Sequence, residues 1–393
     1  MSVPAPRVPP ALVVILAGVT AALHVGKLAP AIATLQSALG LTLVQAGFLL
    51  SLVQGAGMLT GVAFGVVADG LGARRSMVLG LAVLAAASAA GGAVSQVPAL
   101  MVLRALEGFG FLLAVLPAPG LVRALVAPGR LNATLGLWGA YMPLGTALAM
   151  LLGPGVVLLL GWRAWWWVLA AATATMAVVL LRTVPATAVT HAAPAPWRAR
   201  LARTLAAPGP WLVALTFALY SGQWLAVVGF LPTIYTAAGL PGAVTGVLSA
   251  LAAAANIVGN IASGRLLQRG VAPRRLFILG FVTMALAATA TFAGTPGLPA
   301  WARFVAVLLF SGFGGLIPAT LFAQAVRVAP GPDTLSTTVG WMQQWSSFGQ
   351  FAGPPLVAAV ASAAGGWQAT WWVTGASSVA GLALALLLTR PAR

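Results

Sequence analysis

Twelve long apolar stretches, nearly free of charged side chains, dominate this chain of 393 residues. A helix needs roughly 20 apolar residues to cross about 30 Å of hydrocarbon, and each stretch can supply them. With 6% charged residues, the chain could not cover the surface of a soluble domain. The stretches are also too continuous for the alternating strands of a β-barrel. We therefore predict an all-α membrane protein with spans near 11–36, 43–68, 76–96, 98–122, 131–160, 164–183, 209–237, 243–267, 275–294, 299–326, 335–363 and 368–389.

A repeat with a period of about 200 residues relates the two halves of the chain. The triplet Gly-Phe-Gly at 108–110 recurs at 312–314, and Gly-Trp-x-Ala-x-Trp-Trp at 161–167 recurs at 366–372. Duplicated hydrophobic units are typical of proteins that move a solute between two similar halves. We predict two six-helix bundles related by a pseudo-two-fold axis. Their expected bounds are 1–183 for the first bundle, 184–208 for a cytoplasmic linker and 209–393 for the second bundle.

The positions of the basic residues indicate membrane topology rather than nucleic-acid binding. The net charge is +17, yet sixteen of the 20 basic residues lie at the termini or in even-numbered loops. By the positive-inside rule, both termini and the 184–208 loop are expected in the cytoplasm. The four basic residues elsewhere are Lys27, Arg104, Arg163 and Arg303.

The segment after the second span resembles the signature loop of the major facilitator superfamily. Its matching residues are Gly65, Asp69, Gly72, Arg74 and Arg75. The Asp69 carboxylate can meet the arginine pair or a helix N-terminus, and the glycines permit close approach and a tight turn. We expect this gating motif to hold the halves together on the inside while the outside is open. The alternative is that these charges are simply solvated in a loop.

Two further segments resemble motifs of the same family. They are Arg-x2-Glu-Gly-x-Gly at 104–110 in the fourth span and Gly-x8-Gly-x3-Gly-Pro at 340–354 in the eleventh. Segments 39–42 and 161–163 are weakly similar to the cyanate and nitroimidazole permease branch. The resemblance implies a monomeric secondary transporter with alternating access, embedded in the lipid bilayer of a bacterial inner membrane. It also implies that spans one, four, seven and ten line a central cavity.

Four ionisable residues fall inside the predicted spans, where a charge costs about 2.5–3.5 kcal/mol on insertion scales. His24 and Lys27 are three residues apart on one face of the first span, and Arg104 and Glu107 can pair on the fourth. We predict that His24, Lys27 and Arg104 bind substrate and that Glu107 and His24 couple transport to protons. The alternatives are that Lys27 snorkels to the outer interface, that His24 bonds a neighbouring backbone group, and that Arg104 and Glu107 form a structural pair.

Polar and aromatic residues on other spans are further candidates for substrate binding. Polar groups that face lipid are costly, so we expect these side chains to face protein or water. Hydrogen bonding between helices is the alternative role for them. The candidates are Tyr141, Tyr220, Gln223, Trp224, Asn256, Gln343 and Ser347.

The charge balance of these candidates favours a small anionic solute. They include two or three groups that can be cationic and a single carboxylate, Glu107, which leaves no counter-charge for a cationic compound. We predict a proton-coupled secondary transporter and not an enzyme. The alternatives are an exporter of hydrophobic compounds and, from another class, a non-transporting membrane sensor or scaffold. No cofactor or metal is expected, because the sequence has no cysteine and no Gly-x4-Gly-Lys-[Ser/Thr] loop.

Overall fold

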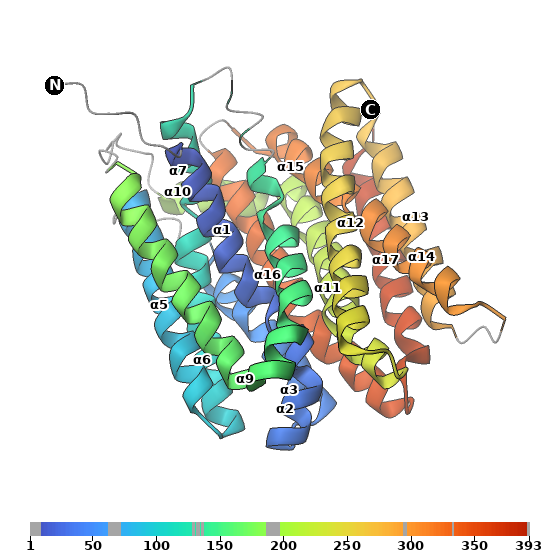
Figure 1. The fold of residues 1–393 in the computed structure, drawn as a ribbon. Coiled ribbons are helices and arrows are strands. Elements are labelled where there is room, and N and C mark those ends of the chain that lie inside the picture. The colour runs from blue at the N-terminus through green and yellow to red at the C-terminus, as the bar shows by residue number, and fades with distance from the viewer. Residues whose placement is uncertain are drawn as a thin grey trace.

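The structure is a computed structural model. It describes residues 9–61, 72–127, 130, 134, 137–185, 197–293, 297–331 and 334–390. These residues form a bundle of long helices (Figure 1). In the N-terminal part the helices are α1 (Pro10–Gly26), η1 (Ala29–Ala31), α2 (Ile32–Leu39), α3 (Leu43–Ser51), η2 (Leu52–Gln54), α5 (Ala73–Ala93), α6 (Val97–Val115), α7 (Ala118–Leu125) and α9 (Tyr141–Thr183). They continue with α10 (Trp197–Ala206), α11 (Pro208–Ala237), α12 (Gly242–Gln268), α13 (Pro273–Phe292), α14 (Ala300–Gly314), α15 (Leu316–Val328), α16 (Leu335–Ala363), η4 (Trp367–Ala369) and α17 (Thr370–Leu388).

The helices account for the predicted spans. Among the described residues, 10 helical stretches are long and apolar enough to cross a membrane. One of them, α9, has 43 residues and breaks at Gly161, where φ is 83°, so it supplies both the fifth and the sixth span. The eleventh span is α16, whose glutamines and serines make it less apolar than the others. The expected all-α membrane fold is thereby confirmed.

The two halves of the chain lie side by side, and both the start of α1 and the end of α17 lie at the upper end of the bundle in Figure 1. Contacts between the halves run through α3 with α16 and through α9 with α12. Small residues make these contacts possible. A side chain at Gly47 would meet the backbone of Pro355 at 3.0 Å, and one at Gly246 would meet Pro154 at 2.9 Å. The bounds 1–183, 184–208 and 209–393 for the halves and linker stay a prediction.

Within the second half, α11 and α16 approach so closely that their backbones touch. A Cβ atom on Gly349 would overlap the backbone of Ala218, and one on Gly353 would overlap that of Gly222. Small residues that let backbones meet are the usual basis of helix association in membranes. Gly349 and Gly353 of the 340–354 segment therefore have a packing role in this structure.

We expect Gly349→Ala to destabilise the protein by about 1–3 kcal/mol, because the added methyl forces α11 and α16 apart. The matched control is Gly375→Ala on α17, where an added Cβ meets open space and helix propensity rises. Tryptophan-monitored thermal unfolding in detergent should show a lower midpoint for Gly349→Ala only. Equal midpoints for the two variants would contradict this packing.

Candidate functional site

The first span is interrupted where the ionic site begins. Pro30 has no N–H, so the chain leaves the α-helix after Gly26 and continues as the short 3-10 turn η1. The Ala31 N–H bonds the carbonyl of Leu28 at 2.9 Å, which leaves the Lys27 carbonyl without its helical donor. The indole of Trp165 in α9 supplies that donor at 3.0 Å. The break therefore fixes Lys27 at the end of α1.

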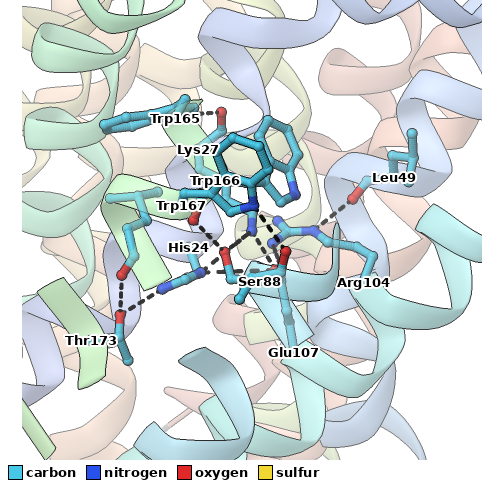
Figure 2. A network of polar contacts seen from close by, with 12 residues as sticks. His24, Lys27, Leu49, Ser88, Arg104, Glu107, Trp165, Trp166, Trp167 and Thr173 are labelled. Atoms are coloured by element: carbon cyan, nitrogen blue, oxygen red, sulfur yellow. Dashed lines mark hydrogen bonds and ion pairs between the residues drawn. The ribbon is translucent and has the colours of Figure 1, made fainter. Parts of the chain in front are cut away.

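The Lys27 ammonium is enclosed by protein on every side and has three acceptors (Figure 2). It forms an ion pair with Oε1 of Glu107 in α6. It also donates to the Ser88 hydroxyl of α5 at 3.0 Å and lies 3.5 Å from Nδ1 of His24. The ring of Trp166 covers the ammonium, with its centroid 4.7 Å away. An ammonium has three N–H donors, so this set satisfies it.

Glu107 is shared between two cations. Its Oε2 accepts from Nη1 of Arg104, one helical turn away, at 2.6 Å, while Oε1 meets Lys27. Arg104 also reaches out of its own helix, because its Nε donates to the Leu49 carbonyl of α3 at 3.0 Å. Lys27, Arg104 and Glu107 are 0%, 2% and 1% exposed. We call His24, Lys27, Arg104 and Glu107 the ionic cluster.

The ionic cluster carries one more positive than negative charge when His24 is neutral. Glu107 is the only acidic residue in the described part of the chain. The Nη2 of Arg104 is buried and has no hydrogen-bond partner, so its two N–H donors are unsatisfied. The space lined by Leu49, Arg104, Glu107 and Trp166 is too small for a water molecule. In this conformation the cluster is therefore closed, with an excess positive charge.

Some of the predictions about these four residues can be decided from the contacts. The pairing of Arg104 with Glu107 is confirmed. Snorkelling of Lys27 to the interface is wrong, because the ammonium turns inward to Glu107. The ring of His24 bonds the Thr173 side chain at 2.8 Å rather than a backbone group. Whether the cluster binds substrate or protons stays a prediction.

A second polar group lies in the other half, around Ser311 of α14. The indole of Trp224 donates to the Ser311 hydroxyl at 3.0 Å. Asn256 of α12 donates to the Ser311 carbonyl and to the Tyr220 hydroxyl, each at 2.9 Å. Asn260 donates to the side-chain oxygen of Asn256 at 2.9 Å. Three predicted binding residues, Tyr220, Trp224 and Asn256, are thus brought together.

The other predicted binding residues make different contacts. Gln223 accepts from Ser378 of α17 at 2.9 Å. Tyr141 stacks on Trp138, with ring centroids 4.4 Å apart. Ser347 lies at the contact between α16 and the second span, where a Cβ on Gly57 would overlap it. Gln343 is partly exposed on α16.

Only part of the predicted gating motif lies within the described residues, because Gly65 and Asp69 fall outside them. Gly72 adopts a positive φ of 81° immediately before α5, a conformation that glycine permits. The guanidinium of Arg74 donates to the carbonyl of Leu181 in the last turn of α9. Arg75 is exposed. Arg74 therefore ties the start of the third span to the end of the sixth.

Four residues that contribute to the ionic cluster were not predicted from the sequence. Ser88 and Thr173 lie inside the predicted third and sixth spans, but Ser76 and Thr175 lie there too, so residue type alone did not single them out. Trp166 belongs to the repeated Gly-Trp-x-Ala-x-Trp-Trp motif, and Pro30 is a proline inside a span. Both patterns are visible in the sequence, but neither indicates contact with Lys27.

The helices and the buried ionic cluster define a multi-pass membrane protein built from two similar halves. The sequence matches the family model described as Major Facilitator Superfamily over residues 12–343 and 212–393. The chain belongs to the Major Facilitator Superfamily. It is a secondary transporter that works by alternating access between its two halves, and it is not an enzyme. No curated protein sequence matches the chain.

Solved structures share the fold at low sequence identity. One is a crystal structure of a bacterial homologue of the human lysosomal transporter Spinster, inward-facing and unoccupied. It aligns with a TM-score of 0.74 and 15% identity, covering 97% of this chain and 95% of that one. The inward-facing and occupied conformation of such a homologue aligns at 0.78 and 14% identity, covering 97% and 96%. These comparisons give no support to the cyanate and nitroimidazole permease branch.

We expect the charge balance of the ionic cluster to govern stability. Glu107→Gln leaves two buried cations without a counter-charge and should cost about 3–5 kcal/mol. Lys27→Met keeps the Arg104–Glu107 pair and removes the excess charge, so its unfolding midpoint should equal or exceed that of the parent. Thermal unfolding in one detergent checks the order. Adding Lys27→Met to Glu107→Gln should recover part of the loss, and equal destabilisation by the two single variants would contradict the charge argument.

Proposed function

We propose that the chain transports a small anionic solute across the bacterial inner membrane, coupled to proton movement at the ionic cluster. The observation that carries the proposal is the unpartnered Nη2 of Arg104 beside an excess positive charge. A buried guanidinium donor without an acceptor is costly, and an anion would supply the missing acceptor. A cation would meet two like charges there. The small-anion substrate therefore fits the cluster better than a cationic compound.

Proton coupling follows from what an arriving anion would do to the ion pairs. Glu107 holds both Lys27 and Arg104, so an anion must compete with its carboxylate for the same cations. A proton on Glu107 would free one of its oxygens and release a cation to the substrate. His24, whose Nδ1 lies 4.0 Å from Oε1 of Glu107, is placed to exchange a proton with that carboxylate. Binding and protonation would thus favour each other, as symport requires.

Orientation and gating complete the proposal. We place both termini and the linker at 184–208 in the cytoplasm, because the basic residues gather in that set of loops. Arg74, bonded to the end of α9, and Asp69, five residues earlier in the sequence, would belong to the gate at the cytoplasmic end. The other half contributes Tyr220, Trp224 and Asn256 as the facing wall of the binding site.

We expect small anions to raise the melting temperature of the purified protein and inorganic or organic cations to leave it unchanged. With an anion identified, Arg104→Lys should weaken its binding about 10- to 100-fold, the loss of about 1.5–3 kcal/mol for a charged hydrogen bond. Lysine keeps the positive charge but has one ammonium nitrogen in place of the three nitrogens of the guanidinium.

The matched control for this test is Trp224→Phe, which alters the wall of the other half and keeps every charge. Binding of the anion should survive that change better than it survives Arg104→Lys. Stabilisation by apolar compounds alone, lost in Trp224→Phe and kept in Arg104→Lys, would contradict the proposal and favour the exporter of hydrophobic compounds.

Asp69→Asn should slow transport in proteoliposomes and leave the affinity for substrate unchanged, because the change acts on the balance between conformations. Turnover and binding are measured separately, by uptake of labelled substrate and by thermal shift. Arg303→Gln, which changes a basic residue far from the motif in sequence, serves as the control. Parent-like turnover in Asp69→Asn would assign this residue to the solvated loop instead.

A further inference from the structure

The hydroxyl of Thr173 decides which nitrogen of His24 carries the proton. Thr173 donates its only hydroxyl hydrogen to the carbonyl of Leu169, one turn earlier in α9, at 2.8 Å. The same oxygen lies 2.8 Å from Nε2 of His24. Because the hydroxyl has already used its hydrogen, its oxygen can only accept from the ring. Nε2 must therefore carry a hydrogen.

The opposite edge of the His24 ring faces charged groups. Nδ1 lies 3.5 Å from the Lys27 ammonium and 4.0 Å from Oε1 of Glu107. An ammonium has only donors, so Nδ1 accepts from it and carries a lone pair. The charged groups around His24 are Lys27 on its own helix and Arg104 and Glu107 on α6, while α5 and α9 present the hydroxyls of Ser88 and Thr173 (Figure 2).

Ser88 fixes the Lys27 side of this contact in the same way. Its hydroxyl hydrogen goes to the carbonyl of Trp166 at 3.0 Å, so its oxygen accepts from the Lys27 ammonium at 3.0 Å. Both hydroxyls are thus anchored to backbone carbonyls of α9 and act only as acceptors towards the cluster. These two hydroxyl–carbonyl hydrogen bonds therefore determine which atoms of Lys27 and His24 donate hydrogens to Ser88 and Thr173.

We infer that Thr173 is a positioning residue that holds neutral His24 as the Nε2–H tautomer, with the Nδ1 lone pair directed at Lys27 and Glu107. This inference rests on the proposed proton coupling for its role in transport, but not for its geometry. A proton that leaves the Lys27 ammonium bonds to Nδ1 and leaves a neutral amine and an imidazolium. The new Nδ1–H then faces the Glu107 carboxylate. The opposite tautomer would present a hydrogen to Lys27 and could not accept that proton.

The test reads the tautomer directly by ¹⁵N NMR. The chain has two histidines, so His191→Asn leaves His24 as the single labelled ring in the full-length protein. In this background the ¹⁵N shifts should show a protonated Nε2 and an unprotonated Nδ1 at neutral and mildly alkaline pH. Thr173→Val keeps the shape but removes the acceptor, and the ratio of Nε2–H to Nδ1–H should fall about 5-fold, as for one lost hydrogen bond.

Two further variants separate positioning from a general structural effect. Thr173→Ser retains a hydroxyl that can bond the Leu169 carbonyl, so it should restore the parent spectrum. Ser88→Ala removes a partner of Lys27 without touching Nε2, and should keep the Nε2–H tautomer. A parent protein with the hydrogen on Nδ1, or a Thr173→Val spectrum identical to the parent's, would overturn the inference.

The transport assay distinguishes this inference from the proposed function. In proteoliposomes, Thr173→Val should reduce uptake driven by a pH gradient more than it reduces substrate exchange without one, and Thr173→Ser should recover it. Uptake by the parent that does not respond to a pH gradient, together with the expected NMR result, would contradict proton coupling and leave the tautomer assignment standing.

Discussion

A single carboxylate held between two cations, in a place that water does not reach, is the interaction on which this structure depends. Glu107 offers one oxygen to Lys27 and the other to Arg104, and none of the three side chains is more than 2% exposed. Charges in such surroundings persist only when every partner is in position. The break at Pro30 and the backbone-anchored hydroxyl of Ser88 provide those positions. The surrounding helices therefore supply the hydrogen-bonding partners that water would supply to exposed ion pairs.

The fold could be predicted from the sequence because lipid imposes a strong and local constraint. Within lipid a long, continuous apolar stretch bonds its own backbone groups as a helix, and the predicted eleventh span coincides with α16 at 335–363. The Arg104–Glu107 pair could be predicted for the same reason, since residues three apart share a helix face. The contacts of Lys27 with Ser88 and of His24 with Thr173 could not. They join residues 61 and 149 positions apart, and helical periodicity carries no information about which faces of different helices meet.

The two halves share a plan but differ in chemistry at equivalent positions. Aligning the Gly-Phe-Gly triplets places Ser311 opposite Glu107 and Leu308 opposite Arg104. In the first half a side chain of the first span donates to the carboxylate, and in the second half Trp224 of the seventh span donates to the Ser311 hydroxyl. The indole and the hydroxyl thus form a neutral counterpart of the ion pair. The described residues thus show a charged contact between the first and fourth spans in one half and an uncharged contact between the seventh and tenth spans in the other.

The ionic cluster lies within one half, so a contact must link it to the other half if it affects the movement between them. Rocking of the halves need not separate Lys27 from Glu107, because α1, α5, α6 and α9 belong to the same half. Arg104 supplies the connection, since its Nε holds the carbonyl of Leu49 in α3. The next residue, Leu50, fills the space that a side chain at Gly229 of α11 would need. Leu49, which Arg104 binds, is therefore adjacent in sequence to Leu50, which packs against the other half. The small anion proposed above, by drawing Arg104 from Glu107, would act on α3 through the hydrogen bond to Leu49, while the rest of the cluster stays in place.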